Sequence, residues 1–198
     1  MKITTLSIFA AAALALAGCA GHHKKILVFA SSEIQVDNSQ KAITVAEGST
    51  HQEKELDFDG TDPVSLTVTA PSGKYTLLAS EDGLYIANLK KDTVVGSFQH
   101  TGAETGASRE ITQAQLTGRI DSLTKLIHGE NVSSANHNYF IAPHTIVKIT
   151  SASAAKVFGP YTTIPSSFDA GSVPEVYKFY TNGEVKDIIS KLTVMTIK

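Results

Sequence analysis

Polar and apolar residues alternate along much of the chain between positions 26 and 100, and a period of two residues predicts β-strands with one buried face. In "VSLTVTA", residues 64–70, valine and leucine alternate with serine and threonine. Segments of the same kind are "EIQVD", "AITVA", "ELDFD", "KYTLLAS", "GLYIANL" and "TVVGSF", and turn signals such as Asp82-Gly83 separate them. Short strands at this spacing predict an antiparallel sandwich or an open barrel for residues 26–100.

The pattern changes after the segment 100–108, which is rich in glycine, alanine and threonine, and a helical period follows it. A first helix is expected to begin at Thr112, which forms a capping box with Gln115, and to end at Gly129. Its apolar stripe consists of Leu116, Ile120, Leu123 and Ile127.

A second helix is expected to begin at Thr181, where Glu184 completes another capping box. Its apolar stripe consists of Val185, Ile188, Ile189 and Leu192. Between the two helices, strand patterns return in "YFIA", "TIVKIT", "AKVFG" and "EVYKFY". The sequence therefore predicts an α+β fold, with a β-rich region at 26–100 and an α+β region with two amphipathic helices at 109–198.

Residues 1–18 have the composition of a targeting segment. Lys2 gives the segment a positive start, and the stretch 6–17 is almost wholly apolar. This stretch is too short for a membrane-spanning helix, which needs roughly 20 apolar residues. A positive start, a short apolar core and small residues at its end are typical of a secretory signal peptide.

The end of this segment, Leu16-Ala17-Gly18-Cys19, resembles the lipobox of bacterial lipoproteins. The resemblance implies that a signal peptidase cleaves between Gly18 and Cys19 and that Cys19 carries acyl chains. Each buried CH₂ of such a chain adds about 0.8 kcal/mol of membrane affinity. The resemblance therefore implies stable attachment to a membrane.

Cys19 is the only cysteine, so the lipoprotein interpretation leaves no thiol for a disulfide, a nucleophile or a zinc ligand. Residues 19–25 are expected to form a lipidated tether, and folded structure is expected to begin at Ile26. Removal of residues 1–18 leaves 16 basic and 19 acidic side chains, a net charge near −3. This balance excludes the basic footprint of a nucleic-acid-binding protein.

The residue after Cys19 is Ala20 rather than aspartate. By resemblance to the sorting rule of enteric bacteria, this favours the outer membrane over retention in the inner membrane. The following "HHKK", residues 22–25, is basic and therefore lacks the acidic run that resembles the surface-export signals of some Bacteroidota. We therefore expect a protein of the cell envelope that is anchored in the outer membrane and faces the periplasm.

Few residues of the sequence match a catalytic or metal-binding motif. The spacing of Ser122 and Lys125 matches the S-x-x-K motif of penicillin-binding proteins, but no K-[ST]-G motif accompanies it. The acidic stretch 47–62 fails the pattern of a calcium-binding loop and is expected to form a solvated rim. The sequence thus assigns no catalytic residue, no metal ligand and no cofactor.

Three residues remain as candidates for contact with a ligand or partner. His137 and His144 are the candidate pocket residues, because histidine is the usual general base near neutral pH. Tyr161 lies in a segment flanked by prolines and is the candidate for an exposed aromatic contact. No tryptophan offers an alternative platform.

These observations favour a lipid-anchored envelope protein with a binding or structural role, whose partners are the membrane, through Cys19, and another envelope protein. One alternative is a periplasmic hydrolase with a dispersed site in its C-terminal half, which requires His137, His144 and an acidic residue of 166–184 to converge. A second alternative is a subunit of an envelope assembly whose sheet edge pairs with a partner strand.

Overall fold

A computed structural model describes residues 22–99, 111–152, 154–165, 168 and 174–196. Within these residues the chain is mostly β and carries two helices, so its α+β class is confirmed. The first strands are β1 (His23–Ala30), β2 (Ile34–Asp37), β3 (Ala42–Val45), β4 (Gln52–Asp59), β5 (Val64–Ala70) and β6 (Gly73–Ala79). The remaining elements are β7 (Gly83–Asn88), β8 (Val94–Gln99), α1 (Gln113–Ile127), β9 (Asn138–Ile141), β10 (Thr145–Thr150), β11 (Lys156–Phe158), β12 (Val176–Thr181) and α2 (Asn182–Thr196).

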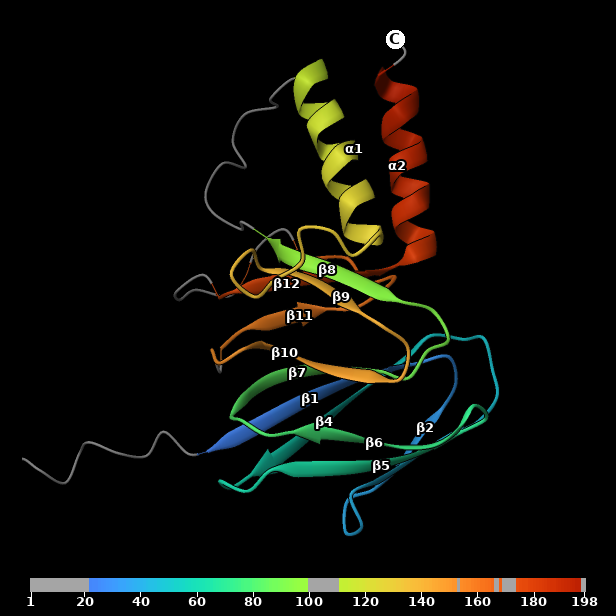
Figure 1. Cartoon of the computed structure of the whole chain (residues 1–198), viewed down its shortest axis with the longest axis vertical. Coiled ribbons are helices and arrows are strands. Elements are labelled where there is room, and N and C mark those ends of the chain that lie inside the picture. The colour runs from blue at the N-terminus through green and yellow to red at the C-terminus, as the bar shows by residue number, and fades with distance from the viewer. Residues whose placement is uncertain (1–21, 100–110, 153, 166–167, 169–173, 197–198) are drawn as a thin grey trace, which may run out of the picture.

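The strands form three four-stranded sheets. Sheet A has the order β10-β7-β1-β4, sheet B the order β2-β3-β5-β6, and sheet C the order β11-β12-β8-β9. In sheet A, β1 is antiparallel to β4 but parallel to β7, and in sheet B, β3 is parallel to β5. The antiparallel arrangement expected for residues 26–100 is therefore wrong at these two pairs, because parallel pairing joins strands that are distant in the sequence. Figure 1 shows the sheets stacked as layers, with sheet A in the middle and the helices beyond sheet C.

Sheet A contributes to two apolar cores, because its strands are buried on both faces. Ile26 and Val28 of β1 pack in a core shared with sheet B. Phe29 of the same strand packs in a core shared with sheet C, together with Tyr177 and Phe179. Burial on both faces explains why β1 has a continuous apolar run rather than an alternating pattern.

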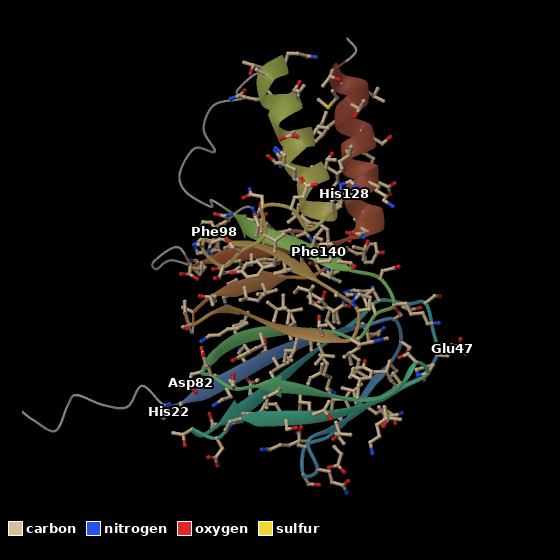
Figure 2. All side chains as sticks on the ribbon, in the orientation of Figure 1. His22, Glu47, Asp82, Phe98, His128 and Phe140 are labelled. Atoms are coloured by element: carbon tan, nitrogen blue, oxygen red, sulfur yellow. The ribbon has the colours of Figure 1, made fainter. Side chains whose placement is uncertain are left out.

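The helices form an antiparallel pair on the outer side of sheet C (Figure 1). Their inner ends share a small core of Val95, Leu126 and Val185, and Phe140 lies beneath them in Figure 2. At the outer end of the pair, Nε2 of Gln113 donates a 2.6 Å hydrogen bond to the carbonyl oxygen of Thr196. Neither helix, nor any other among the described residues, has the length and hydropathy of a membrane-spanning segment.

Both predicted capping boxes are confirmed. The Thr112 hydroxyl accepts from the backbone N–H of Gln115, whose side chain accepts from the Thr112 N–H. At α2, the Thr181 N–H donates to Glu184 Oε2 at 2.8 Å, and the Glu184 N–H donates to the Thr181 hydroxyl at 3.2 Å. Each box satisfies backbone donors that would lack partners in the first turn of a helix.

Each sequence region contributes a strand to a sheet formed mainly by the other. Strand β8, from the region 26–100, lies in sheet C between β12 and β9. Strand β10, from the region 109–198, lies in sheet A beside β7. The two regions therefore share sheets and cores.

The first strand begins at His23, three residues before the expected start at Ile26. Lys24 is only 1% exposed, and its ammonium donates to the Gly60 carbonyl at 2.9 Å and to Asp82 at 3.0 Å. His22 lies beside the same carboxylate (Figure 2). The sequence interpretation was wrong here because a run of basic residues is usually solvated, whereas these side chains have partners on β4 and on the turn before β7. Residues 1–21, on which the expected signal peptide and Cys19 fall, lie outside the described residues.

Candidate functional site at the loop end

The parallel strands β1 and β7 give the sheets two distinct ends. His22 and Asp82 lie at one end, and Glu47 lies at the other (Figure 2). We call the latter the loop end, and the former the tether end. The loop end consists of the segments 31–33, 46–51, 71–72, 89–93, 142–144 and 159–165. The eight residues of β1 separate the two ends by about 26 Å.

A hydrogen-bonded chain of three titratable side chains lies at the loop end. Lys90 Nζ is 3.1 Å from His51 Nδ1, and His51 Nε2 is 2.8 Å from Glu53 Oε1. His51 immediately precedes β4, and Lys90 follows β7, so the sheet positions both ends of this chain. We call these three residues the lysine–histidine cluster.

Two lysines at this end are buried. Burial lowers the pKa of Lys90, and the carboxylates of Asp92, Glu184 and Glu53 partly offset this effect. Burial also lowers the pKa of Lys178, whose ammonium donates to the carbonyls of Gly159 and Phe179 at 2.5 and 3.0 Å. A buried amine with a displaced pKa beside a histidine and a carboxylate is a feature of functional sites.

Tyr161, the exposed aromatic expected from the sequence, lies over this cluster. Its ring is 5.6 Å from the ring of His51, and Lys90 Nζ is 5.7 Å from its centroid. The residue is 65% exposed and has a φ of +64°. Its backbone N–H donates to Glu184 Oε1 at 2.8 Å, which helps to hold this unusual conformation. Strained residues of this kind concentrate at ligand-contacting positions.

A cleft lies on the opposite side of the segment 89–91, between sheets A and B. Its apolar surface comes from Val45, Ala46, Ala70, Pro71 and Leu89, and its polar lining comes from Ser31, Glu47, Gly48, Ser72, Lys91 and His144. Lys91 therefore lines the cleft, while its neighbour Lys90 contacts His51 on the other side. The loop after β7 connects the two candidate areas.

His144, one of the two histidines predicted to line a pocket, lies in this cleft. Its Nε2 is 3.1 Å from the hydroxyl of Ser72, and its ring centroid is 4.8 Å from that of Tyr75. The Tyr75 hydroxyl is buried and has no hydrogen-bond partner among the described residues. Burial raises the pKa of Tyr75 to about 12.

His137, the other predicted pocket residue, lies at the tether end. Its Nδ1 is 3.4 Å from the Tyr177 hydroxyl, which donates to Glu175 at 3.0 Å, and its ring packs against Phe98. Strand β9 separates His137 from His144. The structure thus brings His137 near an acidic residue of 166–184 but does not bring the two histidines together.

The sequence interpretation did not identify the lysine–histidine cluster. His51 and Glu53 belong to the acidic stretch 47–62, which was expected to be a solvated rim. Their spacing of two residues was the available signal, because an extended backbone places both side chains on one face. Lys90 had no such signal, since only the pairing of sheet A brings it near.

Other carboxylates of the acidic stretch form ordinary ion pairs. Asp57 and Asp59 flank the ring of His23, at 3.1 and 3.0 Å from its two nitrogens. In the parts of the chain that the structure describes, no group of three or more His, Cys, Asp or Glu side chains is placed to hold a metal ion.

Comparison of the chain with protein-family models, with curated proteins and with solved structures gives no match.

Proposed function

We propose that this chain is a lipid-anchored protein of the cell envelope that binds a partner with its loop end. The lipobox resemblance of Leu16-Ala17-Gly18-Cys19 supports the anchor. The binding role rests on one observation, the strained and exposed Tyr161 above the buried lysine–histidine cluster. Preorganised aromatic side chains of this kind are frequent anchors of protein interfaces.

The position of β1 supports an orientation in which the loop end faces away from the membrane. Only residues 20–22 separate Cys19 from the strand, so an acylated Cys19 would hold the tether end close to the membrane. The loop end, about 26 Å further along β1, would then face away from the lipid. We propose the outer membrane on the basis of Ala20, and its periplasmic face on the basis of the basic residues 22–25.

We further infer that sheets A and B form a sandwich, as the sequence of residues 26–100 suggests. The support for this inference is the core that the two sheets share, to which Ile26, Leu66 and Leu77 contribute. A rigid unit of this kind would hold the loops 46–51 and 71–72 in fixed positions at the loop end.

Replacement of Cys19 by serine tests the anchor. We expect Cys19→Ser to lose metabolic labelling with a radioactive fatty acid and to move from the membrane to the soluble fraction. Separation of the two membranes by density then tests the proposed location. A Cys19→Ser protein that remains membrane-bound and normally processed would contradict the lipoprotein assignment.

Co-purification from detergent-solubilised membranes tests the binding role. We expect a stoichiometric partner with the unaltered protein, and its loss with Tyr161→Ala. Leu78→Ala is the matched control, because Leu78 of β6 is also a large apolar residue and is 56% exposed. Retention of the partner by both variants would place the interface away from Tyr161, and absence of any partner would remove the binding role.

Two alternatives differ in their support. A hydrolase that uses His137 and His144 together has lost its main argument, because the two residues lie at opposite ends of β9. An assembly subunit that pairs through a sheet edge remains a second candidate, since β4 and β6 each end a sheet. A partner that Tyr161→Ala retains, but that a proline in β4 abolishes, would favour this alternative.

A further inference from the structure

Ser72 and His144 meet in the loop-end cleft, although 72 positions separate them in the sequence. Ser72 is the second residue of the two-residue turn between β5 and β6, in which Ala70 pairs with Gly73. Pro71 restricts the backbone at the first turn position, which limits the conformations of the turn that carries Ser72. The hydroxyl oxygen lies 3.1 Å from His144 Nε2, within the reach of a nucleophile and its base.

The surroundings of His144 fix its imidazole. Its backbone N–H donates to the Asn88 carbonyl at 2.7 Å, at the end of β7. Its φ of +60° is a conformation that few residues other than glycine adopt. Its ring packs on Tyr75 at 4.8 Å between centroids. When Nδ1 carries the proton, Nε2 is free to accept the hydroxyl proton of Ser72.

The lining of the cleft indicates the substrate. The apolar surface of Val45, Ala70 and Leu89 suits a short acyl group, since these residues extend the core between sheets A and B. Lys91 lines the same cleft, as does Glu47, and an ammonium group here would favour the negative charge that develops on the oxygen when a carbonyl is attacked. A small, uncharged carboxylic ester has both an acyl group that fits the apolar surface and a carbonyl oxygen that an ammonium group would stabilise.

We propose that Ser72 and His144 form a nucleophile–base pair that hydrolyses small carboxylic esters in this cleft. The Ser72 oxygen forms a bond with the carbonyl carbon while its proton moves to His144 Nε2. The bond between the carbonyl carbon and the alcohol oxygen then breaks, and the alcohol leaves with that proton. Water, activated by the same imidazole, next attacks the acyl group on Ser72, releases the carboxylic acid and restores the serine.

A fluorophosphonate probe tests this proposal on the full chain purified in detergent. The serine oxygen displaces fluoride and forms a stable bond to phosphorus, which mass spectrometry of peptides locates. We expect the adduct on Ser72, and hydrolysis of p-nitrophenyl acetate above the buffer rate. Ser72→Ala is expected to lose both, whereas Ser65→Ala, which alters an exposed serine of β5 outside the cleft lining, is expected to retain both.

A second variant separates catalysis from structure. His144→Asn removes the base but keeps a residue that tolerates a positive φ, so the turn is expected to survive, which circular dichroism checks. We expect the rate of labelling at Ser72 to fall by about 100-fold or more. The absence of an adduct on Ser72, or labelling that is equally fast in His144→Asn, would overturn the proposal. This outcome is independent of the anchor and of any partner bound through Tyr161.

Discussion

Lys90 and Glu53 approach the same imidazole from opposite sides, at 3.1 Å from His51 Nδ1 and 2.8 Å from His51 Nε2. The contact joins the loop after β7 to the start of β4 across the end of sheet A. Glu53 also packs against Gly159, where an added Cβ would overlap the Glu53 carboxylate. The Glu53 carboxylate therefore lies between the His51 imidazole and the backbone at Gly159, and its side chain remains 27% exposed.

Removal of this carboxylate should destabilise the fold. Glu53→Ala leaves the buried ammonium groups of Lys90 and Lys178 without one of their compensating charges, and we expect a loss of about 1–3 kcal/mol in the free energy of unfolding. Glu55→Ala is the matched control on the same strand, because Glu55 is solvent-exposed and pairs with Lys25 at the surface. Its expected cost is within about 1 kcal/mol. Equal midpoints in urea unfolding would contradict the role given to Glu53.

Removal of two tyrosine hydroxyls should affect the stability of the protein differently. Tyr75→Phe deletes a buried hydroxyl without a partner among the described residues, and we expect the protein to become more stable or to stay unchanged. Tyr139→Phe deletes a hydroxyl that donates to the Ile149 carbonyl at 2.6 Å. We expect this variant to lose about 1 kcal/mol. Urea unfolding at pH 7 measures both, and a larger loss for Tyr75→Phe would contradict the expectation.

Tyr75 should also produce a pH dependence in alkaline solution. Burial raises its pKa to about 12, whereas an unfolded chain loses this proton near pH 10. The folded state therefore holds more protons between about pH 10 and 12, and its stability should fall as the pH rises through this range. Tyr75→Phe should show a shallower decline in the free energy of unfolding between pH 9 and 11. An unchanged slope would contradict the assignment.

Two glycine-to-alanine substitutions should change the stability of the protein in opposite directions. A Cβ at Gly96 of β8 would lie 2.3 Å from the ring of Phe179, which is fully buried, and we expect a loss of about 1–3 kcal/mol. A Cβ at Gly118 of α1 would meet nothing within 4 Å, and alanine favours a helix over glycine by about 1 kcal/mol. Thermal unfolding of both variants measures the difference. A destabilising Gly118→Ala would indicate a contact on α1 that the isolated chain does not show.

Local features of the fold could be predicted from the sequence, because their causes lie within a few residues. The capping boxes of Thr112 and Thr181 depend on the third residue after each, and both helices begin where expected. Strands with one polar face, such as β5, also follow from their own pattern. The predicted exposure of Tyr161 has the same local basis, since prolines flank its segment.

The partners of the site residues could not be predicted, because they depend on how distant strands pair. The meeting of Ser72 with His144 requires β5 to end beside the turn that leads into β10. The burial of Lys24 requires Gly60 and Asp82 to arrive from two later turns. A single sequence carries no signal for such pairings, so the basic residues after Cys19 gave the impression of a solvated tether.

The place of β1 within sheet A has a mechanical consequence. The strand starts directly after residue 22 and pairs with β4 at eight positions and with β7 at six. A pull on the chain ahead of it, such as an anchor at Cys19 would transmit, acts along the strand axis. The hydrogen bonds that join β1 to β4 and to β7 must then break together, rather than one at a time, so the force is shared among all of them. A protein held at this point would resist extension far better than one attached through an edge strand.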